Sequence, residues 1–236
     1  MELRLIQFFS ALKSSVISLI AFFIALWVVN HFQSYWLVKI NLIEQVLYGL
    51  FAITILLSSY FNRSRLALAA LIFLLFYLNI SQLLPWQTWL LSHREWLMLA
   101  GAGMLSALSV LKDRGLLSTH GIYRVLLLSS IGVASYYWFD IAALLISQLA
   151  DVATIAPWLK FITVELPLMI FFLVLVWRCL REKSLAAAAL LASYLIWLGY
   201  FYQIILLPWS VLLSLMMVHY LCVVMIDSYF LAYRTY

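Results

Sequence analysis

Eight long apolar runs follow one another along the chain, separated by short polar connectors. A run of about 20 apolar residues is long enough to cross the hydrocarbon core of a bilayer as a helix. Backbone groups have no water to bond there, and the runs lack the alternating polarity of barrel strands. We therefore expect an all-α bundle of about eight transmembrane helices. Their predicted bounds are Ser14–Asn30, Ile43–Tyr60, Leu66–Leu84, Trp96–Leu111, Tyr123–Ile146, Phe161–Trp177, Leu185–Leu207 and Ser210–Phe230.

The composition excludes the other broad classes of protein. Of the 236 residues, 67% are hydrophobic and 10% are charged, whereas a soluble domain is roughly half apolar and a quarter charged. A soluble domain, a disordered tail and a fibrous repeat are excluded. We expect residues 1–226 to form one multi-pass module and residues 227–236 to leave it as a short helix. No small-x-small cleavage site follows the first run, so we expect that run to be retained rather than removed as a signal peptide.

Lysine and arginine are distributed unequally between the two predicted membrane faces. Under the positive-inside rule, the face with more of them is cytoplasmic. Three lie on the opposite face, namely Lys39, Arg94 and Lys160. The sequence therefore predicts cytoplasmic N- and C-termini and a multi-pass protein of a bacterial inner membrane. The eleven on the cytoplasmic face are Arg4, Lys13, Arg63, Arg65, Lys112, Arg114, Arg124, Arg178, Arg181, Lys183 and Arg234.

Tryptophans mark the outer helix ends. Amphipathic indole rings settle at the headgroup level of a bilayer, so we expect an anchoring role for them. A connector at Ser81–Glu95 is expected to lie along the same interface. Small residues four apart, as in Ala102 with Ser106, indicate where helices can pack closely, either within one bundle or between two copies of the chain. The tryptophans are Trp36, Trp86, Trp89, Trp96, Trp158 and Trp209.

Two carboxylates lie within the apolar runs, where an ionisable group is costly and is therefore a functional candidate. Asp140 and Glu165 lie at similar depths below the outer ends of consecutive runs. Consecutive helices usually pack as neighbours, so the two acids are candidates for one outward-open ligand pocket. The rings of Tyr136, Tyr137 and Trp138 could add a cation-binding surface. The alternative is that each acid is satisfied locally, Glu165 by the dipole at the start of its helix.

His219, near the centre of the last run, is an intramembrane polar candidate, either on a proton path or as a packing group. We expect no metal site, because no His-x-x-x-His, Glu-x-x-His or Cys-x-x-Cys motif occurs. Phosphate-binding and nucleophile-elbow motifs are also missing from the sequence. The chain therefore offers no catalytic residue and no cofactor site, and whether it is part of an enzyme is left open.

The C-terminal segment from Asp227 to Arg234, Asp-Ser-Tyr-Phe-Leu-Ala-Tyr-Arg, continues the last helix toward the cytoplasm. It resembles the short lead helix that enters the GGDEF domain of membrane-bound bacterial diguanylate cyclases. The Asp-x-Leu-Thr-Gly-Leu run that opens such a domain is not in this sequence. The resemblance implies the N-terminal sensor module of such a cyclase, whose cytosolic domain makes cyclic di-GMP from GTP. It implies a signal-coupling role for Asp227, Tyr229, Tyr233 and Arg234.

These observations favour a membrane sensory and dimerisation module. We expect its partners to be a lipid bilayer, a second copy of the chain, and a small-molecule or membrane-borne stimulus. We expect no nucleic acid as partner, because the basic residues lie in pairs between apolar runs rather than on one soluble face. The alternatives are a small permease or ion-coupled transporter and a structural subunit of a larger membrane complex.

Overall fold

A computed structural model describes residues 2–83, 87–113, 119–149, 158, 161–182 and 184–235. No strand occurs within these ranges, so the predicted all-α class is confirmed. Eight helices of 17 or more residues occupy the positions of the eight predicted runs. The elements are α1 (Glu2–His31), α2 (Gln33–Leu37), α3 (Ile40–Tyr60), α4 (Ser64–Ile80), α5 (Gln87–Ser92), α6 (Arg94–Val110), α7 (Thr119–Leu149), the π-helical turn η1 (Phe161–Glu165), α9 (Leu166–Glu182), α10 (Leu185–Phe201) and α11 (Trp209–Thr235).

In the part of the chain that the structure describes, five segments are long and apolar enough to cross a membrane, which is the pattern of a helical membrane protein. They lie in α1, α3, α7, the combined η1 and α9, and α11. Helices α4, α6 and α10 have 17 residues each, about 25 Å at 1.5 Å per residue. That is shorter than a hydrocarbon core of about 30 Å. A helical membrane bundle is therefore supported, and the count of about eight transmembrane helices remains a prediction.

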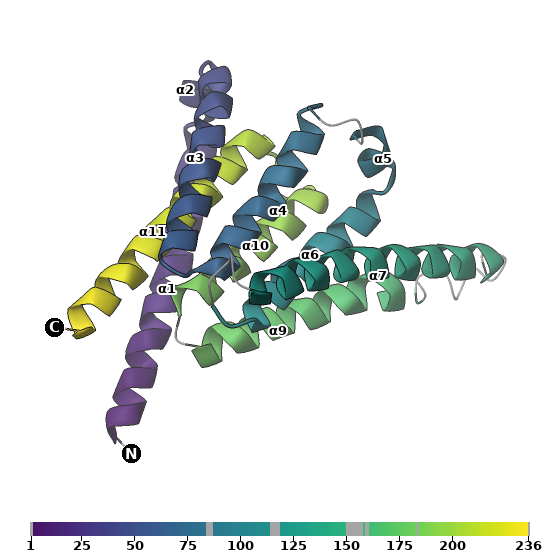
Figure 1. Ribbon diagram of the computed structural model, residues 1–236. Coiled ribbons are helices and arrows are strands. Elements are labelled where there is room, and N and C mark those ends of the chain that lie inside the picture. Colours follow the sequence, from purple (N-terminus) through teal and green to yellow (C-terminus); the bar gives the residue numbers. More distant parts are fainter. Residues whose placement is uncertain are drawn as a thin grey trace.

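The helices run in several different directions in the view of Figure 1. Helices α1 and α3 stand nearly upright, α4, α10 and α6 run diagonally, and α7 lies across the view beside α9. The pair α7 and α9 therefore runs in a different direction from α1 and α3. Between α3 and α4 the chain reverses at a short turn, where Asn62 adopts the left-handed conformation, with φ of 57°. Asparagine tolerates this conformation better than most residues.

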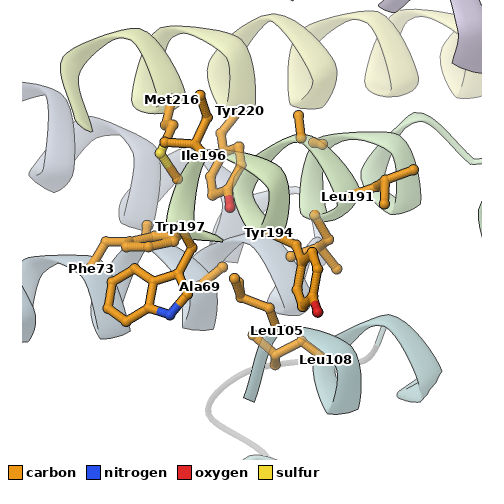
Figure 2. Packing of buried hydrophobic residues seen from close by; sticks show 14 of the residues in the cluster. Ala69, Phe73, Leu105, Leu108, Leu191, Tyr194, Ile196, Trp197, Met216 and Tyr220 are labelled. Atoms are coloured by element: carbon orange, nitrogen blue, oxygen red, sulfur yellow. The ribbon is translucent and has the colours of Figure 1, made fainter. Parts of the chain in front are cut away.

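Helix α10 is the centre of the bundle. It packs against α1, α4, α6, α9 and α11, and its residues from Leu185 to Tyr194 are all buried. A helix that is apolar on every side is expected in the interior of a bundle. Its few polar groups are bonded within the bundle: Ser193 Oγ lies 2.6 Å from Tyr220 Oη of α11, and Tyr194 Oη donates to Leu168 O of α9 at 2.5 Å. Figure 2 shows Tyr194, Trp197 and Tyr220 packed among apolar side chains of the core.

Close approach of α6 to α10 depends on Gly101. A Cβ atom added at Gly101 would lie 2.4 Å from Cζ2 of Trp197. The indole of Trp197 is buried there and donates from Nε1 to Met98 O at 3.0 Å. The small-residue face predicted from Ala102 and Ser106 of α6 is therefore used for packing, and both residues are buried. The face of α7 that carries Ser130 is exposed instead.

The Trp197 ring joins a cluster of aromatic side chains at one end of α10. Trp209 lies 5.6 Å from it between ring centroids and also packs against Phe76 and Tyr200. Trp209 is only 6% exposed, so it does not lie at the molecular surface like the anchoring residue expected from sequence. The difference arises because Trp209 begins α11 directly against the core, where burial of its ring is favourable.

Candidate functional site

Charged side chains from separate helices gather at the end of the bundle where α6 and α9 finish and α4 and α7 begin. We call this group the charged network. Its side chains for which ion pairs are recorded are between 6% and 19% exposed. Charges this deeply buried are found paired, since an unpaired buried charge is costly. The network comprises Arg63, Arg65, Arg124 and Arg178 with Asp113, Glu182 and Asp227.

Arg65, in the first turn of α4, is the centre of the charged network. Its Nε and Nη2 donate to Asp113 Oδ2 at 3.0 and 2.9 Å, and its backbone N–H donates to Asp113 Oδ1 at 3.1 Å. Its Nη1 donates to Glu182 Oε2 at 2.5 Å. The planar guanidinium suits this role because its donors reach two carboxylates at once. Arg65 therefore joins α4 to the segment after α6 and to the end of α9.

The network also satisfies the C-terminal carbonyl groups of α6. The last carbonyls of a helix have no partner within the helix and carry partial negative charge. Arg178 of α9 donates to Ser109 O at 3.0 Å and to Val110 O at 3.2 Å, and it also bonds Glu182. Arg124 of α7 donates to Lys112 O at 2.6 Å. Arginines from neighbouring helices thus cap α6 and fix its end against α7 and α9.

Asp227 connects α11 to the charged network. Its Oδ2 lies 3.4 Å from Nη2 of Arg63. The Nη1 of Arg63 in turn lies 3.9 Å from Asp113 Oδ2. The Arg63–Asp227 contact is an ion pair without a hydrogen bond, because Asp227 Oδ2 and Arg63 Nε have no hydrogen-bond partner among the described residues. Buried polar atoms left unbonded in this way are costly. This contact is therefore the least satisfied link of the network.

The remaining predicted coupling residues lie in α11 beyond Asp227. Tyr229 is 66% exposed. Tyr233 and Arg234 belong to the last turns of α11, and their side chains lie outside the described part of the structure. The structure thus brings Asp227 into a defined contact, while the coupling role of all four residues remains a prediction.

Glu165 lies in a small pocket at the opposite end of the bundle. The pocket has a volume of about 230 Å³ and is also lined by Arg94, Glu95 and Tyr202. Tyr202 Oη donates to both carboxylate oxygens of Glu165 at 3.0 Å. The phenol of Tyr202 therefore acts as a hydrogen-bond donor to Glu165.

Asp140 is exposed on α7 and is not among the described residues that line the Glu165 pocket. The predicted pocket shared by the two acids therefore remains a prediction. Of the neighbouring aromatic residues, Tyr137 is exposed, and Tyr136 lies 6.0 Å from Trp89 between ring centroids. His219 has a packing environment: Phe22 lies 4.8 Å away between ring centroids, and Ser18 Oγ lies 3.5 Å from its Nε2.

Trp138 joins α7 to η1. Its Nε1 donates to Thr163 O at 2.9 Å. Thr163 lies four residues before Pro167, which has no backbone N–H to offer to that carbonyl. The indole hydrogen bond thus ties α7 to the turn that precedes α9.

The sequence pattern identified the arginines of the charged network as topology signals and Asp227 as a coupling residue, but two acidic partners, Asp113 and Glu182, were missed. Asp113 and Glu182 lie at helix ends, where acids are usually solvated. One signal was present in the sequence, since Arg178 and Glu182 are four residues apart and so share one face of a helix. The contact of Arg65 with both acids joins residues far apart in the chain and left no local signal.

The fold and its apolar helices define a helical membrane protein, without a metal-binding group among the described residues. Comparison of the chain with protein-family models, with curated proteins and with solved structures gave no match. The function is therefore argued from the geometry of the charged network and from the C-terminal helix.

Proposed function

We propose that the chain is a membrane sensory module whose helix α11 transmits the state of the bundle to a cytosolic output domain. The observation that carries the proposal is the Arg63–Asp227 ion pair, which ties α11 to the charged network without a hydrogen bond. The rest of the network is held by hydrogen bonds, as at Arg65 and Arg178. A change in the bundle would therefore alter the contact of α11 before it disrupts the other links.

The proposal requires two arrangements of the helix bundle that are similar in free energy. A stimulus shifts such an equilibrium only if it binds one arrangement more tightly than the other. Helix α11 is suited to respond because it packs along α3 and also contacts α1, α4 and α10. Breaking the Arg63–Asp227 contact leaves both groups free to find new partners. In this account the intact and broken contacts correspond to two signalling states.

The resemblance of Asp227 to Arg234 to the lead helix of GGDEF proteins points to a diguanylate cyclase as the output domain. The predicted cytoplasmic C-terminus agrees with this, since such a domain uses cytosolic GTP. The dimer proposed for the module would bring two output domains together. The permease alternative makes a different prediction, namely solute uptake by the purified chain in proteoliposomes.

The proposed coupling is tested by fusing a GGDEF domain after Tyr236 and measuring cyclic di-GMP in cells that lack other cyclases. Arg63→Asp and Asp227→Arg, each placing like charges together, are expected to shift the output per molecule of protein by about fivefold or more, the low end of typical coupling energies. The double exchange restores an opposite-charge pair and is expected to return the output toward that of the parent.

Arg181→Gln provides the matched control, because Arg181 is exposed on α9 and stacks on Trp177 outside the charged network. It is expected to leave the output unchanged. If the single charge reversals match this control at equal protein levels, the Arg63–Asp227 pair does not carry the signal and the proposed mechanism is wrong.

A further inference from the structure

A second and larger pocket lies where α4, α5, α6 and α10 meet the start of α11. Its volume is about 600 Å³, within the range of small-molecule sites. Most of its wall is aromatic or aliphatic, and includes Phe76, Tyr200 and Leu207. The polar groups on this wall are few, and come from Asn79, Arg94, Gln203 and Trp209.

Two of these polar groups are buried and lack partners. Asn79 is 8% exposed and Trp209 is 6% exposed. Asn79 uses its Nδ2 to donate to Leu75 O at 2.8 Å, but its Oδ1 has no partner among the described residues. The Nε1 of Trp209 also has no acceptor in the part of the chain that the structure describes. Unbonded buried polar groups are rare, and these two atoms, one acceptor and one donor, belong to side chains of residues that line the pocket.

Arg94 supplies a positive charge to the wall of this pocket. Among the described residues that line the pocket, it is the one with a charged side chain. Its Nη2 donates to Phe201 O at 2.7 Å, and its Cζ lies 5.6 Å from the centroid of the Phe201 ring. These two contacts hold the guanidinium in place. Arg94 also lines the smaller pocket described above together with Glu95 and Glu165, which do not line this one.

Gln203 adopts the left-handed conformation, with φ of 58°. Glycine is the usual residue at such a position after a helix, because a side chain is strained there. Ile204 N–H and Ile205 N–H both donate to Gly199 O, which fixes this turn at the end of α10. Gln203 thus places an amide in the pocket wall at a position where glycine would be less strained.

We propose that this pocket binds an anionic amphiphile that carries a hydroxyl group. The acidic group would contact Arg94 and accept from Trp209 Nε1, the hydroxyl would donate to Asn79 Oδ1, and the acyl chain would lie on the apolar wall. Such a ligand would provide a donor for Asn79 Oδ1 and an acceptor for Trp209 Nε1. The idea that this ligand is the stimulus rests on the proposed sensory function. The binding of the ligand to the pocket does not depend on that function.

The pocket also provides a route to the charged network. Trp209 is the first residue of α11, and Asp227 lies 18 residues later on the same helix, about 27 Å at 1.5 Å per residue. A ligand that contacts Trp209 therefore acts on the helix whose far end forms the Arg63–Asp227 ion pair.

Equilibrium binding of radiolabelled 2-hydroxydodecanoate, dodecanoate and dodecanol to the full chain in phosphatidylcholine nanodiscs tests the proposal, with empty nanodiscs as the background. We expect 2-hydroxydodecanoate to bind most tightly and dodecanol most weakly. Arg94→Gln should weaken binding of both acids about tenfold, as expected for one lost contact of ordinary strength. Lys39→Gln, a loss of the same charge at an exposed residue outside the pocket, should change nothing.

Two further variants separate binding from folding. Asn79→Leu should abolish the advantage of 2-hydroxydodecanoate over dodecanoate. It should change the melting temperature little, because removal of the unbonded acceptor offsets loss of the bond to Leu75 O. Gln203→Gly should weaken binding and raise the melting temperature. Gln82→Gly, at another left-handed position outside the pocket, should raise the melting temperature without affecting binding.

The source of the amphiphile is tested by replacing part of the neutral lipid with phosphatidylglycerol. Competition with the labelled acid assigns the pocket to a bilayer lipid, and absence of competition assigns it to a free amphiphile. Equal binding of all three probes, or equal effects of Arg94→Gln and Lys39→Gln, would overturn the proposal. Binding that follows the predicted order without any change in cyclic di-GMP output would retain the site and remove its sensory role.

Discussion

Replacement of Arg65 by alanine is expected to lower the free energy of unfolding by about 3 kcal/mol, near the low end of the cost of breaking a buried ion pair. Arg65 is 5% exposed and bonds both Asp113 and Glu182. Its removal leaves the two carboxylates buried with fewer partners. The loss is not larger because Asp113 keeps a contact with Arg63 and Glu182 keeps one with Arg178.

Unfolding of the purified chain by SDS titration in mixed micelles measures this loss. Arg65→Lys should fall between the parent and the alanine variant, because an ammonium group keeps the charge but cannot form the two-carboxylate fork. Arg181→Ala is the control and should cost less than about 1 kcal/mol, since exposed substitutions have small effects. An equal cost for Arg65→Ala and Arg181→Ala would show that the network does not hold the helix ends together.

Replacement of Gly101 by alanine should lower the free energy of unfolding by about 2 kcal/mol, a typical cost of overpacking a core. The added methyl group would overlap the indole of Trp197. This ring cannot move easily, because it is buried, donates to Met98 O and lies against Phe76 and Phe201. Relief therefore requires α6 and α10 to separate.

Gly49→Ala in α3 provides the matched control, because an added Cβ there meets no atom within 4 Å. Alanine forms helices better than glycine, so this change should raise stability by up to about 1 kcal/mol. The two variants add the same methyl group. The SDS titration should show a lower free energy of unfolding for Gly101→Ala and a higher one for Gly49→Ala. A neutral or stabilising effect of Gly101→Ala would show that α6 and α10 are not packed as closely as described.

The positions of the helices could be predicted from the sequence because each apolar run is long and its ends carry polar residues. Pattern alone also grouped Arg63, Arg65, Arg124 and Arg178 at one membrane face, and the structure gathers the same four at one end of the bundle. Which face of the membrane that end occupies remains a prediction, since it rests on the positive-inside rule.

The partners within the charged network could not be predicted, because they depend on how helices far apart in the chain pack together. Asp113 and Glu182 are separated from Arg65 by 48 and 117 residues. The central place of α10 could be read from the sequence, since Leu185–Phe201 holds no charged residue and is apolar on every side. No sequence signal predicted the burial of Trp209. A tryptophan at a helix end gives the same sequence pattern whether its ring anchors in the headgroups or packs in the core.

The central claim is that α11 leaves the bundle on the cytosolic side, at the end that holds the charged network. The most direct measurement is the activity of two reporters fused in turn after Tyr236, a fluorescent protein that folds in the cytosol and a phosphatase that requires the oxidising space outside it. The account predicts fluorescence from the first fusion and no phosphatase activity from the second. Phosphatase activity without fluorescence, at matched protein levels, would place the C-terminus outside and contradict the proposed signalling role.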